Sequence, residues 1–92
     1  MNNFEEMSEV LKALAHPARL EIVMGLKINE CNVSEIQEKL GLPQSTISQH
    51  LKILKNARII IGRREGTKVC YKVIDPCTKQ IIKLLENGKK FS

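Results

Sequence analysis

Residues 33–54 read VSEIQEKLGLPQSTISQHLKIL, and this stretch decides the fold. Its first part predicts a short helix over residues 34–40, which ends at Gly41 because glycine readily takes the left-handed conformation that follows a helix. Pro43 suits the first turn of a longer second helix, where a missing N–H costs nothing. A short helix, a tight turn and a longer helix form a helix-turn-helix, which we expect over residues 33–56.

The start of the shorter helix carries a sequence typical of helix N-termini. Asn32 and Glu35 make a capping box, in which the first side chain accepts a hydrogen bond from a backbone N–H three residues on. Ser34 and Gln37 make a second, overlapping one. We expect these side chains to cap the helix.

The longer helix divides into an apolar and a polar face. Ile47, Leu51 and Leu54 fall on one stripe and are expected to anchor the helix to the body of the protein. The other positions carry hydroxyl, amide and lysine side chains without carboxylates, which suit base edges and phosphates; a purely solvent-facing helix usually carries Glu–Lys pairs instead. We expect DNA contacts from Gln44, Ser45, Thr46, Ser48, Gln49 and Lys52.

Beyond this helix the hydrophobic pattern changes from helical spacing to alternation. Residues 67–74 alternate apolar and polar side chains, and Gly66 suits the turn before them, so residues 58–74 predict a β-hairpin. A hairpin that follows a helix-turn-helix is a wing. Its cations Arg63, Arg64 and Lys68 are expected beside the backbone or minor groove of a duplex.

Helices are predicted on both sides of this unit. Residues 4–15 place apolar side chains on one stripe, residues 17–26 are mostly apolar, and residues 76–87 carry a further apolar set. The expected fold is mainly α with a small β-hairpin, a winged helix-turn-helix in the order α-α-α-α-β-β-α. The two helices at the ends of the chain carry apolar faces that the core of one domain does not need.

The composition is that of one globular domain over residues 1–92, with 42% hydrophobic and 27% charged residues. No apolar run reaches the roughly 18 residues that a membrane span needs. The N-terminal sequence MNNFEEMSEV lacks the basic start and apolar stretch of a signal peptide. We expect a cytoplasmic protein without a membrane partner.

Charge divides the chain into two halves. Residues 1–46 hold four basic and seven acidic side chains, a net charge of −3, whereas residues 47–92 hold eleven and three, a net charge of +8. A basic half beside an acidic half favours one surface that faces a polyanion. On charge alone, a solvated lysine-rich surface is an equally good interpretation.

Three other classes of protein fit the sequence less well. An enzyme and its cofactor are not expected, because the chain has no phosphate loop, HExxH or GxSxG motif. A reader of single-stranded RNA stacks bases on aromatic side chains, and this chain has only Phe4, Tyr71 and Phe91, scattered along it. A winged-helix module for protein contacts would expose an apolar face where the longer helix is polar.

Three tracts of the chain resemble the ArsR/SmtB family of metal- and redox-responsive repressors: LKALAHPARLEIV, VSEIQEKLGLPQSTISQHLKIL and RREGTKVCYKV. The resemblance implies a homodimer made by the first and last helices, here residues 4–15 and 76–87. It also implies a transcriptional repressor that binds double-stranded operator DNA and leaves it when a small inorganic effector binds. A regulator that needs no effector is the alternative.

One metal site of the resembled family lies at the third helix, and its ligands are not kept. Asn32 and Ser34 stand where the family has two thiolates, and Cys31 is one place off. Soft metals need convergent thiolates. We expect no metal at this site.

A second family site lies on the last helix, and only half of it is kept. Asp75 and Cys77 match the spacing of its first ligand pair, with cysteine in place of histidine. The other pair falls at Gly88 and Phe91, which cannot ligate. No metal is expected here either.

The three cysteines, Cys31, Cys70 and Cys77, are an odd number with no C-x-x-C spacing. They therefore predict neither a disulfide framework nor a zinc ribbon, and we expect reduced thiols. Redox sensing is a second interpretation, and Cys70 with Cys77 is the pair first considered because one lies on the hairpin and the other at the next helix start. A nonstandard metal site is the third.

The two histidines are expected to be structural. His16 stands before Pro17 at a helix boundary, since the residue before proline leaves the helical region. His50 borders the apolar stripe of the longer helix, and we expect it to pack against the body rather than to bind phosphate.

Overall fold

The computed structural model describes residues 3–88, and these residues form five helices and one two-stranded antiparallel sheet. The order confirms the predicted winged helix-turn-helix, mainly α with a small hairpin. Across residues 3–88, no helix is both long and apolar enough to cross a membrane. The elements are α1 (Phe4–Leu14), α2 (Pro17–Ile28), α3 (Val33–Leu40), α4 (Gln44–Asn56), β1 (Ile60–Glu65), β2 (Lys68–Val73) and α5 (Pro76–Gly88).

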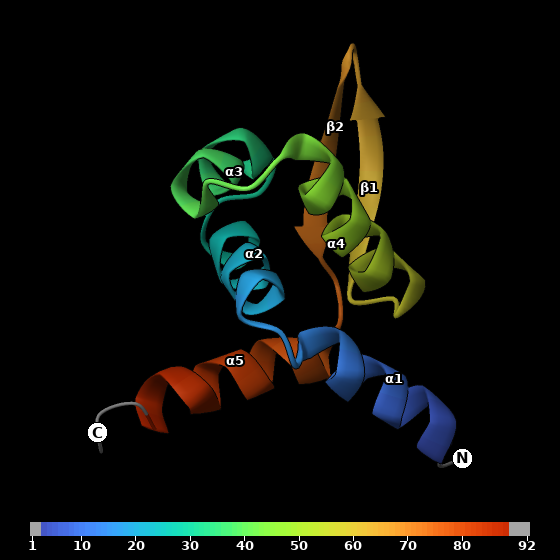
Figure 1. Ribbon diagram of the computed structural model, residues 1–92. Helices are drawn as coiled ribbons and strands as arrows, with labels where there is room; N and C mark the ends of the chain where they lie inside the picture. The colour runs from blue at the N-terminus through green and yellow to red at the C-terminus, as the bar shows by residue number, and fades with distance from the viewer. Residues whose placement is uncertain (1–2, 89–92) are drawn as a thin grey trace.

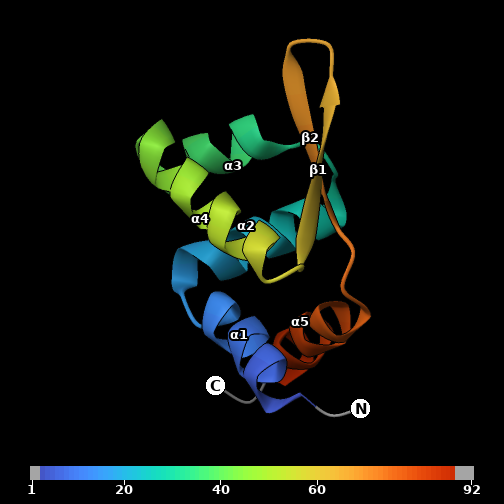
Figure 2. The same ribbon diagram turned by 90° about the vertical axis from the view of Figure 1, so that its right-hand side faces the viewer.

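The elements form two levels (Figure 1). Helices α1 and α5 lie across the base, whereas α3, α4 and the hairpin occupy the opposite end, with α2 between the levels. Seen after a quarter turn, the hairpin extends beyond the helices and its turn lies far from α1 and α5 (Figure 2). The helix-turn-helix and the wing therefore share one end of the molecule.

Local capping explains several helix ends. The side chain of Asn3 accepts a hydrogen bond of 3.1 Å from the N–H of Glu6 and so caps α1. Gly41 ends α3 in the left-handed conformation, with φ of 67°, as predicted. The predicted capping boxes of α3 do not form: Asn32 is the N-cap residue, but its backbone (φ −93°, ψ 36°) is not extended and its side chain makes no capping bond.

The core lies between α2, α4, α5 and the base of the hairpin. Ile59 and Ile60 follow α4 and are fully buried in the core cluster. Their β-branched side chains favour the extended backbone that begins there. Each fully buried aliphatic side chain contributes about 1.5–3 kcal/mol. The largest fully buried side chains are Ile22, Leu26, Leu54, Ile59, Ile60, Ile82, Val23 and Thr78.

The end helices keep large apolar side chains outside this core. On α1 only Leu14 of the predicted stripe is buried, whereas its other members lie on the surface. A set of this size on two neighbouring helices exceeds the scattered apolar residues of an ordinary surface. The exposed members are Phe4 (77%), Met7 (52%) and Leu11 (57%) on α1, and Leu84 (70%) and Leu85 (51%) on α5.

The hairpin has a fixed register. Arg63 lies opposite Cys70, Arg64 opposite Val69, and Glu65 opposite Lys68. Gly66 has φ of 66° in the turn, where an L side chain is rarely tolerated. Because opposite residues share a face and neighbours alternate, Arg63 and Lys68 lie on one face of the wing and Arg64 lies on the other.

Candidate nucleic-acid interface

Helix α4 is anchored and exposed as its sequence predicts. Ile47, Leu51 and Leu54 are 2%, 5% and 0% exposed and hold the helix against the core. Thr46 is half-buried, and the other five predicted contact residues are exposed. The structure thus brings together on one surface Gln44, Ser45, Thr46, Ser48, Gln49 and Lys52.

Arg19 holds α4 to the N-terminal helices, a role that the sequence analysis missed. Its Nε donates to the carbonyl oxygen of Ala13 at 2.6 Å, its Nη2 reaches that of Lys12 at 3.4 Å, and its Nη1 lies 3.2 Å from Nδ1 of His50. One guanidinium on α2 therefore joins the end of α1 to the middle of α4. The planar fork of arginine suits this three-way contact, which a lysine could not reproduce.

His50 packs inside the body, as predicted. His50 is 8% exposed, and the centroid of its ring lies 4.6 Å from that of the His16 ring. Burial lowers the pKa of His50, and the charges of His16 and Arg19 lower it further. His16 itself is the N-cap of α2, where its Nδ1 accepts the N–H of Ala18 at 3.1 Å. Neither histidine is placed to bind a phosphate.

The three predicted wing cations are all exposed, but they are not equivalent. Arg63 donates from Nε and Nη2 to one carboxylate oxygen of Glu65, at 3.2 and 2.9 Å. Both side chains are largely exposed, so this ion pair is weak and can exchange for a phosphate. Arg64 and Lys68 make no such ion pair within residues 3–88.

A groove of about 430 Å³ separates the wing from the helix-turn-helix. Polar side chains of both helices line one wall, including Gln37 of α3 and Gln44 and Ser48 of α4. Lys68 and Tyr71 line the wall formed by the hairpin. The groove brings the start of α4 and the wing to the same concave surface.

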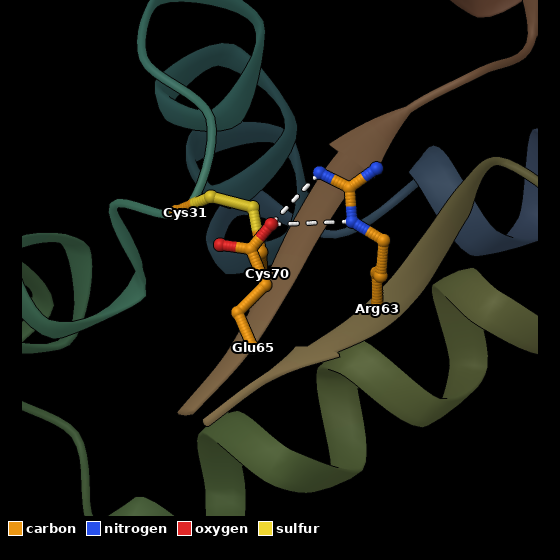
Figure 3. A network of polar contacts seen from close by, with 4 residues as sticks. All are labelled: Cys31, Arg63, Glu65 and Cys70. Carbon is orange, nitrogen blue, oxygen red and sulfur yellow. Dashed lines mark hydrogen bonds and ion pairs between the residues drawn. A yellow bond between two sulfur atoms is a disulfide. The ribbon is translucent and has the colours of Figure 1, made fainter. Parts of the chain in front are cut away.

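Cys31 and Cys70 also line this groove and form a disulfide, with their Cα atoms 4.3 Å apart (Figure 3). The expectation of three reduced thiols is therefore wrong for this pair, and so is the pairing of Cys70 with Cys77, whose thiol is free and exposed. The loop before α3 reaches β2 because the N–H of Cys31 donates to the carbonyl of Tyr71 at 3.3 Å. Sequence spacing does not reveal such a contact between residues 39 apart.

Glu65 joins the two cysteines in a cluster that could offer metal ligands. The two sulfurs and a carboxylate oxygen of Glu65 all lie within 4.8 Å of one another. With the sulfurs bonded to each other, the thiolates that a soft metal needs are not present.

The half site predicted on the last helix has a structural role. Asp75 accepts hydrogen bonds from the backbone N–H and the hydroxyl of Thr78, at 3.0 and 2.6 Å, and so caps α5. Cys77 is exposed nearby, and Gly88 closes the helix. Phe91 lies outside the described residues.

Comparison with known proteins places this surface in context. Residues 16–61 match the family described as bacterial regulatory protein, arsR family. An HTH-type transcriptional regulator of Methanocaldococcus jannaschii is 42% identical over 87 residues, which cover 94% of this chain and 98% of the relative. The transcriptional repressor PagR of Bacillus anthracis is 42% identical over 84 residues, which cover 90% of this chain and 84% of the relative.

Two solved structures extend the likeness to three dimensions. The crystal structure of PagR superposes with a TM-score of 0.77 and covers 89% of this chain and 94% of its own. The solution structure of a homodimeric winged helix-turn-helix DNA-binding domain from Mycobacterium bovis has a TM-score of 0.81 at 29% identity. The match covers 95% of this chain and 81% of that domain. Sequence and fold agree, and the chain belongs to the ArsR family of bacterial regulatory proteins.

Proposed function

We propose that this protein is a homodimeric transcriptional repressor that binds double-stranded operator DNA and releases it in response to a thiol-reactive inorganic effector in the cytoplasm. The observation that carries DNA binding is the polar surface of α4. Five of its six predicted contact residues are exposed beside the wing, while the apolar stripe of the same helix is buried. This is how a recognition helix is presented to a major groove.

The two parts of the surface have different tasks. Gln49 lies on the exposed side of α4, where its amide can bond a base edge such as that of adenine. Arg64 is an exposed cation of the wing and can contact phosphate whatever the sequence. The net charge of +8 over residues 47–92 supports a polyanionic partner for this half.

The dimer is supported by the apolar surface at the opposite end. Phe4, Met7 and Leu11 of α1 and Leu84 and Leu85 of α5 lie on neighbouring helices at the base, away from the wing. A second copy packed there would cover these side chains and leave both α4 helices free. The neighbour from Mycobacterium bovis is a homodimer, which favours the same assembly here.

An effector that acts on thiols is supported by the cysteines. Two of the three are close enough to be bonded, and the third is exposed. The family positions for metal ligands are occupied by Asn32 and Ser34 or used as a cap by Asp75. The chemistry available on this chain is therefore that of sulfur.

Band-shift titrations with the promoter DNA of its own gene and a scrambled duplex of equal length test DNA binding. Gln49→Ala is expected to lower affinity for the promoter about 5- to 150-fold and to leave the scrambled duplex nearly unaffected, since a bidentate base contact discriminates by about 1–3 kcal/mol. Arg64→Ala is expected to weaken binding to both duplexes equally and to reduce the slope of log affinity against log salt concentration by about one. Equal losses on both duplexes for Gln49→Ala would remove its role as a base reader, and affinity that does not change with salt would contradict the whole interface.

A further inference from the structure

We propose that Cys31 and Cys70 form a peroxide-sensitive thiol pair whose oxidation fixes the wing in an orientation that binds DNA weakly. This inference rests on the proposed DNA-binding function and names the residues that regulate it. Its first support is position. The disulfide joins the loop before α3 to β2, so the covalent ring that it closes contains α3, α4 and β1. Oxidation therefore constrains the elements that contact DNA.

The fold does not depend on this bond. The main hydrophobic cluster contains thirteen buried apolar residues and includes neither cysteine, although Cys70 is itself only 7% exposed. Cys31 lies in an exposed loop, and its backbone is already held to β2 by the bond from its N–H to Tyr71. Reduction can therefore release the crosslink without unfolding the domain.

Because of the hairpin register, the crosslink lies on the same face of the wing as two of its positively charged side chains. The hairpin packs on the core through the face that carries buried Ile60, whereas Cys70 is bonded to the loop from the opposite face. Arg63 lies opposite Cys70 and shares that face, as does Lys68. Two of the three wing cations are thus held on the side that the disulfide ties down, and only Arg64 lies on the other face.

Glu65 strengthens this effect in the oxidised state. Its carboxylate lies beside the disulfide and accepts both hydrogen bonds of the Arg63 guanidinium (Figure 3). Arg63 and Glu65 stay largely exposed, and the tether limits how far the hairpin can turn to carry this pair toward a phosphate. In the reduced state the hairpin can roll, and Arg63 is free to exchange Glu65 for the DNA backbone.

The two cysteines differ in the way that a stepwise oxidation requires. Cys31 is exposed, so a peroxide can reach its sulfur, and the thiolate is the reactive form of a cysteine. This thiolate attacks a peroxide oxygen and becomes a sulfenic acid, releasing one water after proton uptake. The sulfur of buried Cys70 then attacks Cys31 Sγ and expels the second water. Two thiols and one hydrogen peroxide thus give one disulfide and two waters, and a dithiol reductant reverses the change by exchange.

The experiment compares the full-length protein after dithiothreitol with the same protein after stoichiometric hydrogen peroxide. Fluorescence anisotropy measures its affinity for labelled promoter DNA at several salt concentrations, and peptide mass spectrometry locates the disulfide. We expect oxidation to weaken binding about 10-fold or more, within the range usual for coupled sites, and to reduce the salt dependence by one or two phosphate contacts. The crosslink should join Cys31 to Cys70 within one chain.

Three variants separate the pair from other thiols. Cys31→Ser alters an exposed residue, so it should fold, bind DNA as the reduced protein does, and lose the response to peroxide. Cys70→Ser should do the same, and Cys77→Ser is the matched control that keeps the full response. A mapped Cys31–Cys70 disulfide with unchanged affinity would refute the switch, as would a response that needs Cys77.

Three further outcomes separate the redox switch from a metal site and from the proposed DNA binding. If the reduced protein held one zinc ion per chain and chelation changed its affinity as much as oxidation did, the Cys31–Glu65–Cys70 cluster would be a metal site and the redox proposal would be wrong. If the reduced and oxidised proteins bound the promoter equally, only the switch would fail. If neither bound any duplex, the proposed function would fail as well.

Discussion

Replacing Arg19 by methionine tests whether one side chain sets the position of the recognition helix. Methionine keeps an apolar stem of similar length but removes the guanidinium that contacts Ala13, Lys12 and His50. Hydrogen bonds from a charged donor are each worth about 1.5–3 kcal/mol. The bond at 2.6 Å is of full strength, whereas those at 3.2 and 3.4 Å are weaker and the site is partly exposed.

We therefore expect Arg19→Met to lower the free energy of unfolding by about 2–3 kcal/mol, which for a domain of this size lowers Tm by about 10–20 °C at fixed protein concentration. Thermal and urea unfolding followed by circular dichroism measure this loss. Arg64→Met is the matched control, since Arg64 is exposed and a surface substitution changes stability by less than about 0.5 kcal/mol.

A second readout shows whether the contact positions α4 or only stabilises the domain. At a temperature where Arg19→Met is fully folded, its affinity for promoter DNA should still fall several-fold, because α4 has lost the guanidinium that joins it to the end of α1. Arg19→Lys keeps the charge but not the fork and should behave in the same way. A loss of stability below about 0.5 kcal/mol, or full affinity of the folded variant, would refute the reasoning.

Two other predictions concern His50 and the base of the molecule. Because burial, His16 and Arg19 lower the pKa of His50 below its ordinary value of 6.5, the unfolded chain takes up the proton first. The contribution of neutral His50 to the free energy of unfolding should be fully present above about pH 6.5 and should be lost as the pH drops below that value. Urea unfolding midpoints at pH 7.5 and 5.5 measure this loss. An equally large drop between these pH values in His50→Gln would contradict the assignment to His50. Leu11→Lys should raise the dimer dissociation constant at least about 100-fold in analytical ultracentrifugation, since each copy loses about 1.5–3 kcal/mol of burial. The control Ile28→Lys, exposed on α2, should leave it unchanged.

The sequence was sufficient for the architecture because periodicity reports burial directly. The stripe of Ile47, Leu51 and Leu54 faces the core as predicted, and the change of period after α4 marks the buried start of the hairpin. Gly41 was predictable because a left-handed residue after a helix has few alternatives to glycine. These features depend on neighbours along the chain.

What the sequence could not supply are contacts between distant segments. Arg19 looks like an ordinary surface arginine until α1 and α4 are placed around it. The bond between Cys31 and Cys70 depends on a loop whose backbone at Cys31 has φ of 69°, which turns the chain toward β2. The same turn explains why Asn32 fails to cap α3, since a cap needs an extended backbone that this loop does not offer.

The two ends of the molecule have to be coupled, because a dimeric repressor reads two half-sites only if its recognition helices are held at a fixed separation. Helix α1 presents Phe4, Met7 and Leu11 to solvent on one side, while its last carbonyls accept hydrogen bonds from Arg19 on the other. The same guanidinium contacts His50 in the middle of α4. In the proposed dimer, the path from the subunit interface to the DNA surface therefore passes through Arg19. The bond between Cys31 and Cys70 holds the wing at a different place, so the thiol pair acts on the wing at a point separate from the contact of Arg19 with α4.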